Sequence, residues 1–385
     1  MLTPEINFVN FKKKLKTKKI NNIFKSLINE NNSILQSLSK KYQDSFDNKF
    51  VKKFKKSNNF RLLGMGGSTL GSQAIYQFLK NKVKKKFDFI DNLQSSTRSN
   101  KTKYTNIIIS KSGNTIETLV NANVLIKKSD KNIFITENKK NYLYLLANKL
   151  KAEVIHHNNF IGGRYSVLSE VGMLPAELMG LKSKDFRQFN SLIKNKKFIN
   201  HLINNVSSTL YFVKQKKFNS VIINYDERSE NLFKWYQQLV SESLGKKSKG
   251  LLPIVSNMPK DNHSVMQLYL DGFKNNFYTF FIVNENKSEK IKNKHILPSH
   301  DFLKNKNLSE IIFAQKKATE IVFKRKKIPF RSFEIKNRSE KNLGELFCFF
   351  ILETILLGRS LNVNPFDQPS VELIKEETKK ILLRS

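Results

Sequence analysis

Short apolar runs that alternate with amphipathic stretches constrain the fold of this chain most strongly. Four runs in the first half predict strands, at 60–66, 106–110, 132–136 and 152–157. The segments between them predict helices, at 68–85, 115–128 and 139–150. Because strands joined through helices pair in parallel by right-handed crossovers, this half predicts a parallel α/β sheet.

The same alternation restarts after a long helical stretch. Further strands are predicted at 220–225, 250–256 and 277–283. Further helices are predicted at 229–244, 262–271, 308–326, 339–358 and 369–383. A chain of 385 residues exceeds the usual size of a single core. We therefore expect a helical, basic outer segment (1–55), a first α/β domain (56–183), a helical connector (184–217) and a second α/β domain with C-terminal helices (218–385).

The charge of the chain would ordinarily indicate nucleic-acid binding, since the formal net charge is +37 and the isoelectric point is near 10. The lysines are scattered through the chain, however, and no zinc-finger, RNA-recognition or leucine-zipper signature accompanies them. We expect no specific nucleic-acid partner, although a positive field would attract a phosphorylated substrate.

The remaining bulk features favour a cytoplasmic protein. The longest apolar run, 343–357, includes Glu345 and Glu353, so it predicts a buried core helix and not a membrane span. The N-terminus lacks the apolar stretch of a secretory signal. The single cysteine, Cys348, allows no disulfide framework, and no histidine has partners at metal-binding spacing. We expect no membrane association and no metal.

Two predicted strand-to-helix junctions are unusually rich in small polar residues. In the first, "GMGGSTLGS", the glycines Gly64, Gly66 and Gly67 allow a ligand to approach the backbone. Ser68 and Thr69 add hydroxyls beside free helix N–H groups. The pattern matches neither the dinucleotide-binding motif nor the P-loop, so a purely structural turn stays open here.

The second junction, "ISKSGNTIET", predicts a phosphate site. Ser110, Ser112 and Thr115 supply three hydroxyls, and Lys111 supplies a cation, directly after a predicted strand. In open parallel sheets ligands bind at this edge, where helix N-termini offer free amides and partial positive charge.

Helix capping is the alternative interpretation of the second junction. Asn114, followed three residues later by Glu117, fits a capping box. Because capping does not explain the three hydroxyls or the lysine, we favour phosphate binding and expect the capping box beside it.

Two further stretches contain candidate catalytic residues. Arg164 follows Gly162 and Gly163, so its guanidinium could enter a cleft and hold an oxyanion; a solvated surface arginine is the alternative. Gln238 and Glu242 are four residues apart on one predicted helix face. Burial there would suit Glu242 to act as a general base, whereas an exposed helix glutamate is the alternative.

The other candidates lie at predicted helix N-termini. His263 opens the helix predicted at 262–271, where the helix dipole disfavours the imidazolium and so assists proton donation. Pro369 is predicted at the first position of the last helix, directly after Gln368. Lys375 follows Gln368 by seven residues, almost two turns, so we expect both on one face.

Six of these stretches, in their order along the chain, resemble the phosphoglucose isomerase family. They are "GMGGSTLGS", "ISKSGNTIET", "GGRYSVLSEVG", "QQLVSESLGK", "DNHSVMQLYLDG" and "NPFDQPSVELIK", between residues 64 and 375. The resemblance implies an α/β fold of two sugar-isomerase-type (SIS) domains, each a mainly parallel sheet flanked by helices. It also implies a reaction without metal or cofactor, and a homodimer with active sites between subunits.

The resemblance also implies roles for the phosphate-binding residues. Ser110, Ser112 and Thr115 would hold the sugar phosphate. Ser68 and Lys111 would assist them.

Further roles carried over from the family concern the sugar and the reaction. Two residues would position the substrate, Gln238 and Gln368. His263, supplied across the dimer interface, would help open the ring, and Lys375 would contact the ring oxygen. Glu242 would move the proton between C2 and C1, and Arg164 would stabilise the cis-enediolate.

The expected activity is therefore the reversible isomerisation of glucose 6-phosphate and fructose 6-phosphate. One alternative is an isomerase that also accepts mannose 6-phosphate. A second alternative, from a different class, is a sugar-phosphate sensor without catalysis, which could lose Glu242, His263 or Arg164; all three are present.

Overall fold

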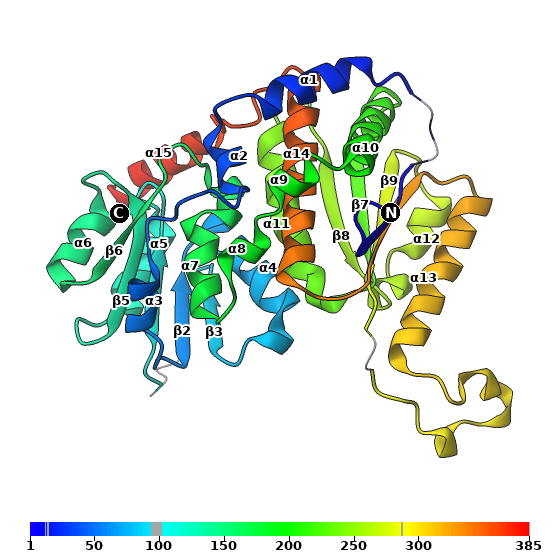
Figure 1. Ribbon diagram of the computed structural model, residues 1–385, viewed down its shortest axis with the longest axis horizontal. Helices are drawn as coiled ribbons and strands as arrows, with labels where there is room; N and C mark the ends of the chain where they lie inside the picture. The colour runs from blue at the N-terminus through cyan, green and yellow to red at the C-terminus, as the bar shows by residue number, and fades with distance from the viewer. Residues whose placement is uncertain (12, 14, 94–101, 286–287, 385) are drawn as a thin grey trace.

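Two five-stranded sheets, each flanked by helices, form the framework of the protein (Figure 1). This computed structural model describes all residues except 12, 14, 94–101, 286–287 and 385. Within the described residues, no helix is long and apolar enough to cross a membrane.

The first sheet is wholly parallel, with the strand order β3-β2-β4-β5-β6. Its strands are β2 (Asn59–Leu63), β3 (Lys86–Ile90), β4 (Thr105–Ile109), β5 (Lys131–Glu137) and β6 (Glu153–His157). The helices of this half are α4 (Leu70–Phe78), α5 (Ile116–Leu125), α6 (Tyr142–Leu150) and α7 (Glu170–Leu178). The four predicted strands and the parallel pairing are confirmed. Strand β3 was not predicted, and helix α4 ends at Phe78, several residues before the expected end of that helix.

The second sheet has the order β1-β10-β9-β7-β8 and is parallel except for β1. Its strands are β1 (Ile6–Val9), β7 (Asn219–Asn224), β8 (Leu252–Asn257), β9 (Asn276–Val283) and β10 (Phe330–Ile335). The helices around it are α10 (Lys196–Lys214), α11 (Glu230–Leu244), α12 (Met266–Asp271), α13 (Leu308–Arg325) and α14 (Glu340–Ser360). The last helix, α15 (Val371–Leu382), lies on the side of the first sheet in Figure 1. Two short helices precede α10, namely α8 (Ser183–Phe186) and α9 (Phe189–Leu192).

The N-terminal segment departs from its predicted helical, outer position. Strand β1 pairs antiparallel with β10, and Ile6 and Phe8 are buried between the sheet and its helices. These two residues alternate with polar or exposed ones, the period of a half-buried strand. The expectation is therefore wrong at residues 6–9. The rest of the segment does form helices, α1 (Lys18–Ile28), α2 (Ser33–Ser37) and α3 (Asn48–Lys53).

Helix α14 lies at the centre of the core, and its prediction as a buried helix is confirmed. Most of its residues are buried, and a large aliphatic side chain such as Leu346 contributes about 1.5–3 kcal/mol when fully buried. Its Glu353 is neutralised by an ion pair with Arg331 of β10. Burial raises the pKa of Cys348 to about 12, so this thiol is a packing residue.

Helices α4 and α11 connect the two halves, since they pack directly against each other. Figure 1 shows both helices in the centre of the molecule, between the two sheets. The chain enters each helix from the carboxyl end of a strand, β2 and β7 respectively.

Candidate active site

The glycine-rich junction 64–69 brings distant parts of the chain together. Gly66 adopts a positive φ of 52° in this junction. A Cβ at Gly67 would lie 2.2 Å from the carbonyl carbon of Gly163, and one at Gly66 would lie 2.7 Å from Nε2 of Gln238. Because neither position has room for a side chain, glycine allows this loop to touch both Gly163 and helix α11.

The hydroxyl residues of the second junction gather at the carboxyl end of β4. Ser110 is buried, and its Oγ lies 2.9 Å from Oγ1 of Thr115. Ser112 is exposed and accepts a hydrogen bond from a backbone N–H. Ser68 is half-buried in the neighbouring glycine-rich junction. The hydroxyls therefore line the start of α5, as expected for an anion site, and their contact with phosphate stays a prediction.

Lys111 lies beside this hydroxyl group in an ion pair. Its Nζ is 3.5 Å from a carboxylate oxygen of Glu137, and the lysine side chain keeps 31% of its area exposed. The cation is therefore accessible to a second anion while Glu137 balances part of its charge.

The capping box predicted from Asn114 and Glu117 does not form. The N-cap of α5 is Thr115, and its side chain makes no capping hydrogen bond. Asn114 instead accepts a hydrogen bond from the backbone N–H of Tyr142, 3.3 Å away at the start of α6. The expectation was wrong because a partner from another helix competes for the same side-chain oxygen.

Arg164 is the best-anchored polar residue of the site. Its guanidinium is 2% exposed, so the alternative of a solvated surface arginine is excluded. It donates five hydrogen bonds, to Ser243 Oγ (2.8 Å), Glu242 Oε2 (3.3 Å), Gln368 Oε1 (2.8 Å) and the carbonyls of Pro365 (2.7 Å) and Asp367 (3.0 Å). A buried guanidinium needs such partners, because an unpaired buried charge is strongly destabilising. Arg164 thus presents a fixed positive charge.

Glu242 and Gln238 meet Arg164 from helix α11. Nε2 of Gln238 donates to Oε1 of Glu242 at 2.9 Å, as expected for residues one turn apart. Glu242 keeps 28% of its side chain exposed, which lies between the two predicted alternatives of burial and full exposure. Within the described residues, the buried Oε1 of Gln238 has no hydrogen-bond partner. An unsatisfied buried acceptor indicates a position where a ligand hydroxyl would be stabilised.

Gln368 joins this cluster, whereas Lys375 does not. Helix α15 begins at Val371, so Gln368 and Pro369 precede it, and the predicted shared helix face does not exist. In the connection before the helix, the side-chain oxygen of Gln368 and the backbone carbonyls of Pro365 and Asp367 accept hydrogen bonds from Arg164. Lys375 forms an ion pair with Glu372 at 2.9 Å and is 52% exposed.

His263 lies at the surface, outside the cluster. It ends a 3-10 turn, and α12 begins only at Met266, so the predicted position at a helix N-terminus is wrong. A hydrogen bond from the N–H of Asn257 to Asp261 stabilises this turn ahead of the helix. Within the described part of the chain, the exposed His263 side chain makes no hydrogen bond or ion pair with the Arg164 cluster.

Two site residues were not predicted from the sequence. Ser243 accepts from Nε of Arg164, and Tyr165 bonds to Ser243 Oγ at 2.8 Å and to the carbonyl of Pro365 at 3.0 Å. Burial raises the pKa of Tyr165, so its hydroxyl stays protonated as a donor. The only indication in the sequence was that each of them follows a predicted site residue: Ser243 follows Glu242, and Tyr165 follows Arg164.

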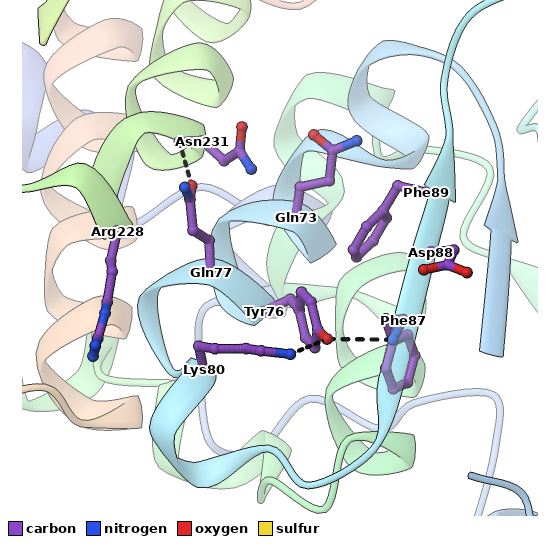
Figure 2. A pocket seen from close by; sticks show the side chains of 9 residues that line it. All are labelled: Gln73, Tyr76, Gln77, Lys80, Phe87, Asp88, Phe89, Arg228 and Asn231. Atoms are coloured by element: carbon purple, nitrogen blue, oxygen red, sulfur yellow. Dashed lines mark hydrogen bonds between the residues drawn. The ribbon is translucent and has the colours of Figure 1, made fainter. Parts of the chain in front are cut away.

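A separate cavity of about 630 Å³ lies between α4, β3 and the start of α11 (Figure 2). Phe87 and Phe89 line it together with polar side chains. Figure 2 shows that these polar groups bond to their neighbours: Lys80 to the hydroxyl of Tyr76, and Gln77 to the backbone N–H of Asn231 at 3.0 Å. No residue of the Arg164 cluster lines this cavity.

Metal ligands are not assembled anywhere in the part of the chain that the structure describes. No three His, Cys, Asp or Glu residues there form a group that could hold a metal ion.

Comparison with known proteins identifies relatives over most of the chain. A family model for phosphoglucose isomerase matches residues 16–384. A Methanocaldococcus jannaschii protein named glucose-6-phosphate isomerase is 32% identical over 370 residues, covering 89% of this chain and 88% of the relative. A Mycoplasmopsis pulmonis protein of the same name is 33% identical, covering 83% and 82% respectively.

Solved structures support the predicted fold class. A hypothetical protein from Thermus thermophilus superimposes with a TM-score of 0.81 at 24% identity, covering 95% of this chain and 94% of its own. A glucose-6-phosphate isomerase from Chlamydia trachomatis gives 0.70 at 17% identity, covering 91% of this chain and 77% of its own. The tagatose-6-phosphate ketose/aldose isomerase from Escherichia coli gives 0.52 at 16% identity, covering 92% and 91%. The prediction of two SIS-type α/β units is confirmed, and the chain belongs to the phosphoglucose isomerase family.

Proposed function

We propose that this protein interconverts glucose 6-phosphate and fructose 6-phosphate. The observation that carries the proposal is the contact between Glu242 and Arg164, 3.3 Å apart, with two glutamines beside them. Aldose–ketose isomerisation needs a base that moves a proton between neighbouring carbons and a fixed cation for the oxygen that gains charge. The family and the names of the relatives agree with this chemistry.

Glu242 is the proposed base. Its carboxylate takes the proton from C2 of the open-chain aldose, and the C2–H electron pair forms the cis-enediolate. The same carboxylate then returns the proton to C1, while the hydroxyl proton of O2 passes to O1 and a carbonyl forms at C2, so the reaction is balanced without an external oxidant. Arg164 stabilises the enediolate oxygen, because its guanidinium is already oriented by five hydrogen bonds and needs no rearrangement.

The sugar phosphate is proposed to bind the junction after β4. Ser110, Ser112 and Thr115 offer hydroxyls beside the first amides of α5, and Lys111 adds a partly exposed cation. Ser68 assists from the glycine-rich junction.

Two glutamines are proposed to orient the sugar hydroxyls, Gln238 and Gln368. The unpaired Oε1 of Gln238 would accept a hydrogen bond from one of them. Gln368 reaches the same place through its contact with Arg164.

Ring opening is proposed to use His263 and Lys375. His263 is exposed and lies outside the cluster of its own chain, which is consistent with donation to the site of a second copy in a homodimer. Lys375 would contact the ring oxygen after leaving its exposed ion pair with Glu372, a contact that costs little to break.

The wider assignments follow from this function. We propose a metal-independent glycolytic isomerase in the cytoplasm, without a membrane or specific nucleic-acid partner. The proposed units are an outer segment (1–55), two SIS domains (56–183 and 218–385) and a connector (184–217), with β1 of the outer segment completing the second sheet.

A coupled assay tests the proposal directly. Purified protein is supplied with fructose 6-phosphate, and glucose 6-phosphate is followed by a dehydrogenase that reduces NADP⁺. We expect turnover that persists in the presence of a chelator. Mannose 6-phosphate in a parallel assay measures specificity at C2. Absence of turnover with fructose 6-phosphate, from a protein that binds it, would favour a sensor.

A further inference from the structure

A buried imidazole lies directly before the loop that contains Arg164. His157 is the last residue of β6 and is 2% exposed. Its Nδ1 lies 3.0 Å from Oε1 of Glu170, and its Nε2 lies 3.0 Å from the carbonyl oxygen of Ile161. The ring therefore bridges the first turn of α7 and the loop between β6 and Arg164.

Both acceptors require a hydrogen on the ring. A carbonyl oxygen can only accept, so Nε2 of His157 must carry a proton to bond Ile161. An ionised Glu170 also only accepts, so Nδ1 must carry a second proton. The His157–Glu170 pair thus holds one proton more than a neutral imidazole beside a carboxylate.

The surroundings of Glu170 place this proton on the imidazole. Oε1 also accepts from the backbone N–H of Asn158 at 2.5 Å, and Oε2 accepts from the hydroxyl of Tyr42 at 3.0 Å. Burial tends to raise the pKa of Glu170, but the hydrogen bond and charge of His157 and the N–H of Asn158 outweigh it, so the pKa is lowered. With the N–H of Asn158 and the hydroxyl of Tyr42 also donating to it, the carboxylate of Glu170 is the acceptor of the pair and the Nδ1–H of His157 is the donor.

The other charged groups around the pair are themselves paired. Asp44, from the N-terminal segment beside Tyr42, accepts from Nη2 of Arg187 at 2.6 Å. Glu177, on α7, accepts from the backbone N–H of Ser183 at 2.8 Å. Since Asp44 and Arg187 neutralise each other, His157 is the group that balances Glu170.

The bridge fixes the backbone that leads into Arg164. Ile161 is three residues before Arg164 and is completely buried. On its other side, Gly163 packs so closely on Gly67 that a Cβ at Gly67 would lie 2.2 Å from the carbonyl carbon of Gly163. The segment from Ile161 to Arg164 is therefore fixed at both ends, by the imidazole and by the glycine-rich junction.

We propose that His157 is a positioning residue for the isomerisation: its doubly protonated ring ties the Ile161 carbonyl to Glu170 and so sets the position of Arg164. The role of Arg164 rests on the proposed function, whereas the protonation state of the ring does not. Without a hydrogen on either ring nitrogen, a lone pair would face an acceptor oxygen and the bridge between Ile161 and Glu170 would be lost. Turnover would then fall without any change in the residues that contact substrate.

The matched variants are His157→Gln and His156→Gln. His156 is the neighbouring residue of β6, but its side chain is exposed, so the same substitution there removes no buried contact. A glutamine at 157 cannot be a cation, and its single amide nitrogen cannot occupy the positions of both ring nitrogens. We expect kcat to fall about tenfold or more, because small displacements of a group that acts in the transition state reduce the rate strongly, with KM changed much less. His156→Gln should behave as wild type.

The split between kcat and KM separates positioning from a merely structural role. Displacement of Arg164 should lower kcat in His157→Gln while KM changes much less and circular dichroism shows a folded protein. Equal kcat in His157→Gln and wild type would overturn the proposal.

A measurement without substrate tests the same ring independently of the proposed function. Nitrogen-15 NMR of histidine-labelled protein, assigned with His157→Gln, should show two N–H groups on one slowly exchanging ring at neutral pH. Hydrogen exchange of the peptide 158–168 should be faster in His157→Gln than in wild type at the same pH. A ring with a single proton at neutral pH would contradict the proposed bridge through His157, even if the protein is an active isomerase. If the ring carries two protons but wild type shows no turnover, the proposed function is wrong, whereas the hydrogen-bonded bridge through His157 is supported.

Discussion

Arg164 and Glu242 meet where the two halves of the molecule join, with Nη1 of the guanidinium 3.3 Å from Oε2 of the carboxylate. Arg164 is 2% exposed and is anchored by its other hydrogen bonds, whereas Glu242 keeps 28% of its side chain accessible. The pair therefore combines an immobile cation with a carboxylate that a substrate can reach. Proton abstraction beside a carbonyl needs these two groups together.

Replacing the base should abolish the chemistry and spare binding. Glu242→Gln keeps the shape of the side chain but cannot accept the C2 proton, so we expect kcat to fall by about 10²–10⁴-fold. Calorimetric titration with sugar phosphate should give an affinity close to wild type. Near wild-type turnover in this variant would remove Glu242 from the role of base.

Removing the hydroxyl pair should weaken binding more than turnover. The double variant Ser110→Ala and Thr115→Ala deletes the two hydroxyls that lie 2.9 Å apart after β4. Phosphate binding is largely equal in the ground state and the transition state, so KM should rise while kcat changes less. An unchanged KM would mean that the phosphate binds at another junction.

Loss of the Ser243 hydroxyl should disturb Arg164 indirectly. Ser243→Ala leaves Nε of a buried guanidinium without its acceptor, which costs about 1–3 kcal/mol of stability and displaces the cation. We expect a lower melting temperature and a reduced kcat. Ser241→Ala, on the same helix but without a side-chain contact to Arg164, is the control and should change neither quantity.

Acid should weaken the ion cluster between α13 and β10. Burial tends to raise the pKa of Glu334, but Lys316, at 2.7 Å, and Lys317 lower it below its usual value. A carboxyl whose pKa is depressed on folding adds stability above the pKa of the unfolded chain, and this stability is lost as the pH falls through the folded pKa.

Thermal unfolding between pH 7 and pH 3 measures this contribution. Glu334→Gln should be less stable than wild type at pH 7, by about 1–2 kcal/mol after allowance for partial solvent screening, and the two should converge in acid. Glu377→Gln, whose ion pair with Lys380 is exposed, should show almost no difference at any pH. A difference for Glu334→Gln that does not shrink in acid would contradict the assignment.

Mixing of inactive subunits tests where His263 acts. Neither Glu242→Gln nor His263→Ala homodimers should turn over efficiently. If His263 serves the partner's site, a mixed dimer has one site with both lesions and one with none. At equal mixing after unfolding and reassembly, about a quarter of wild-type activity should return, because half of the dimers are mixed and each has one intact site of two. No recovery despite verified subunit exchange would place His263 in the site of its own chain.

Much of the fold could be predicted from local patterns. The seven predicted strands and the long helix α14 lie within a few residues of their expected positions, because their apolar runs are continuous and their flanking residues are turn-forming. Two of the errors occurred where a distant partner decided the outcome. Strand β1 forms by pairing with β10 at one edge of the second sheet. Asn114 does not cap α5, because its side-chain oxygen accepts a hydrogen bond from the backbone N–H of Tyr142.

The candidate site likewise has features that the sequence determined and features that only packing determined. The sequence by itself determined which residue types follow the carboxyl ends of the strands: glycines at 64–67, hydroxyls at 110–115 and an arginine after two glycines. Those are local consequences of strand-to-helix junctions, and their order along the chain was sufficient for the family.

Only the tertiary structure decided which of these groups touch. Packing of α4 on α11 brings Gln238 against Gly66, and the connection before α15 places Gln368 on Arg164 while Lys375 turns away to Glu372. The bridge from His157 to Glu170 likewise joins residues whose roles no local pattern reveals. The physical reason is that a buried guanidinium, imidazole or carboxylate needs hydrogen-bond partners, and these partners come from distant parts of the chain. Only the packing of the whole fold determines which groups lie close enough to pair.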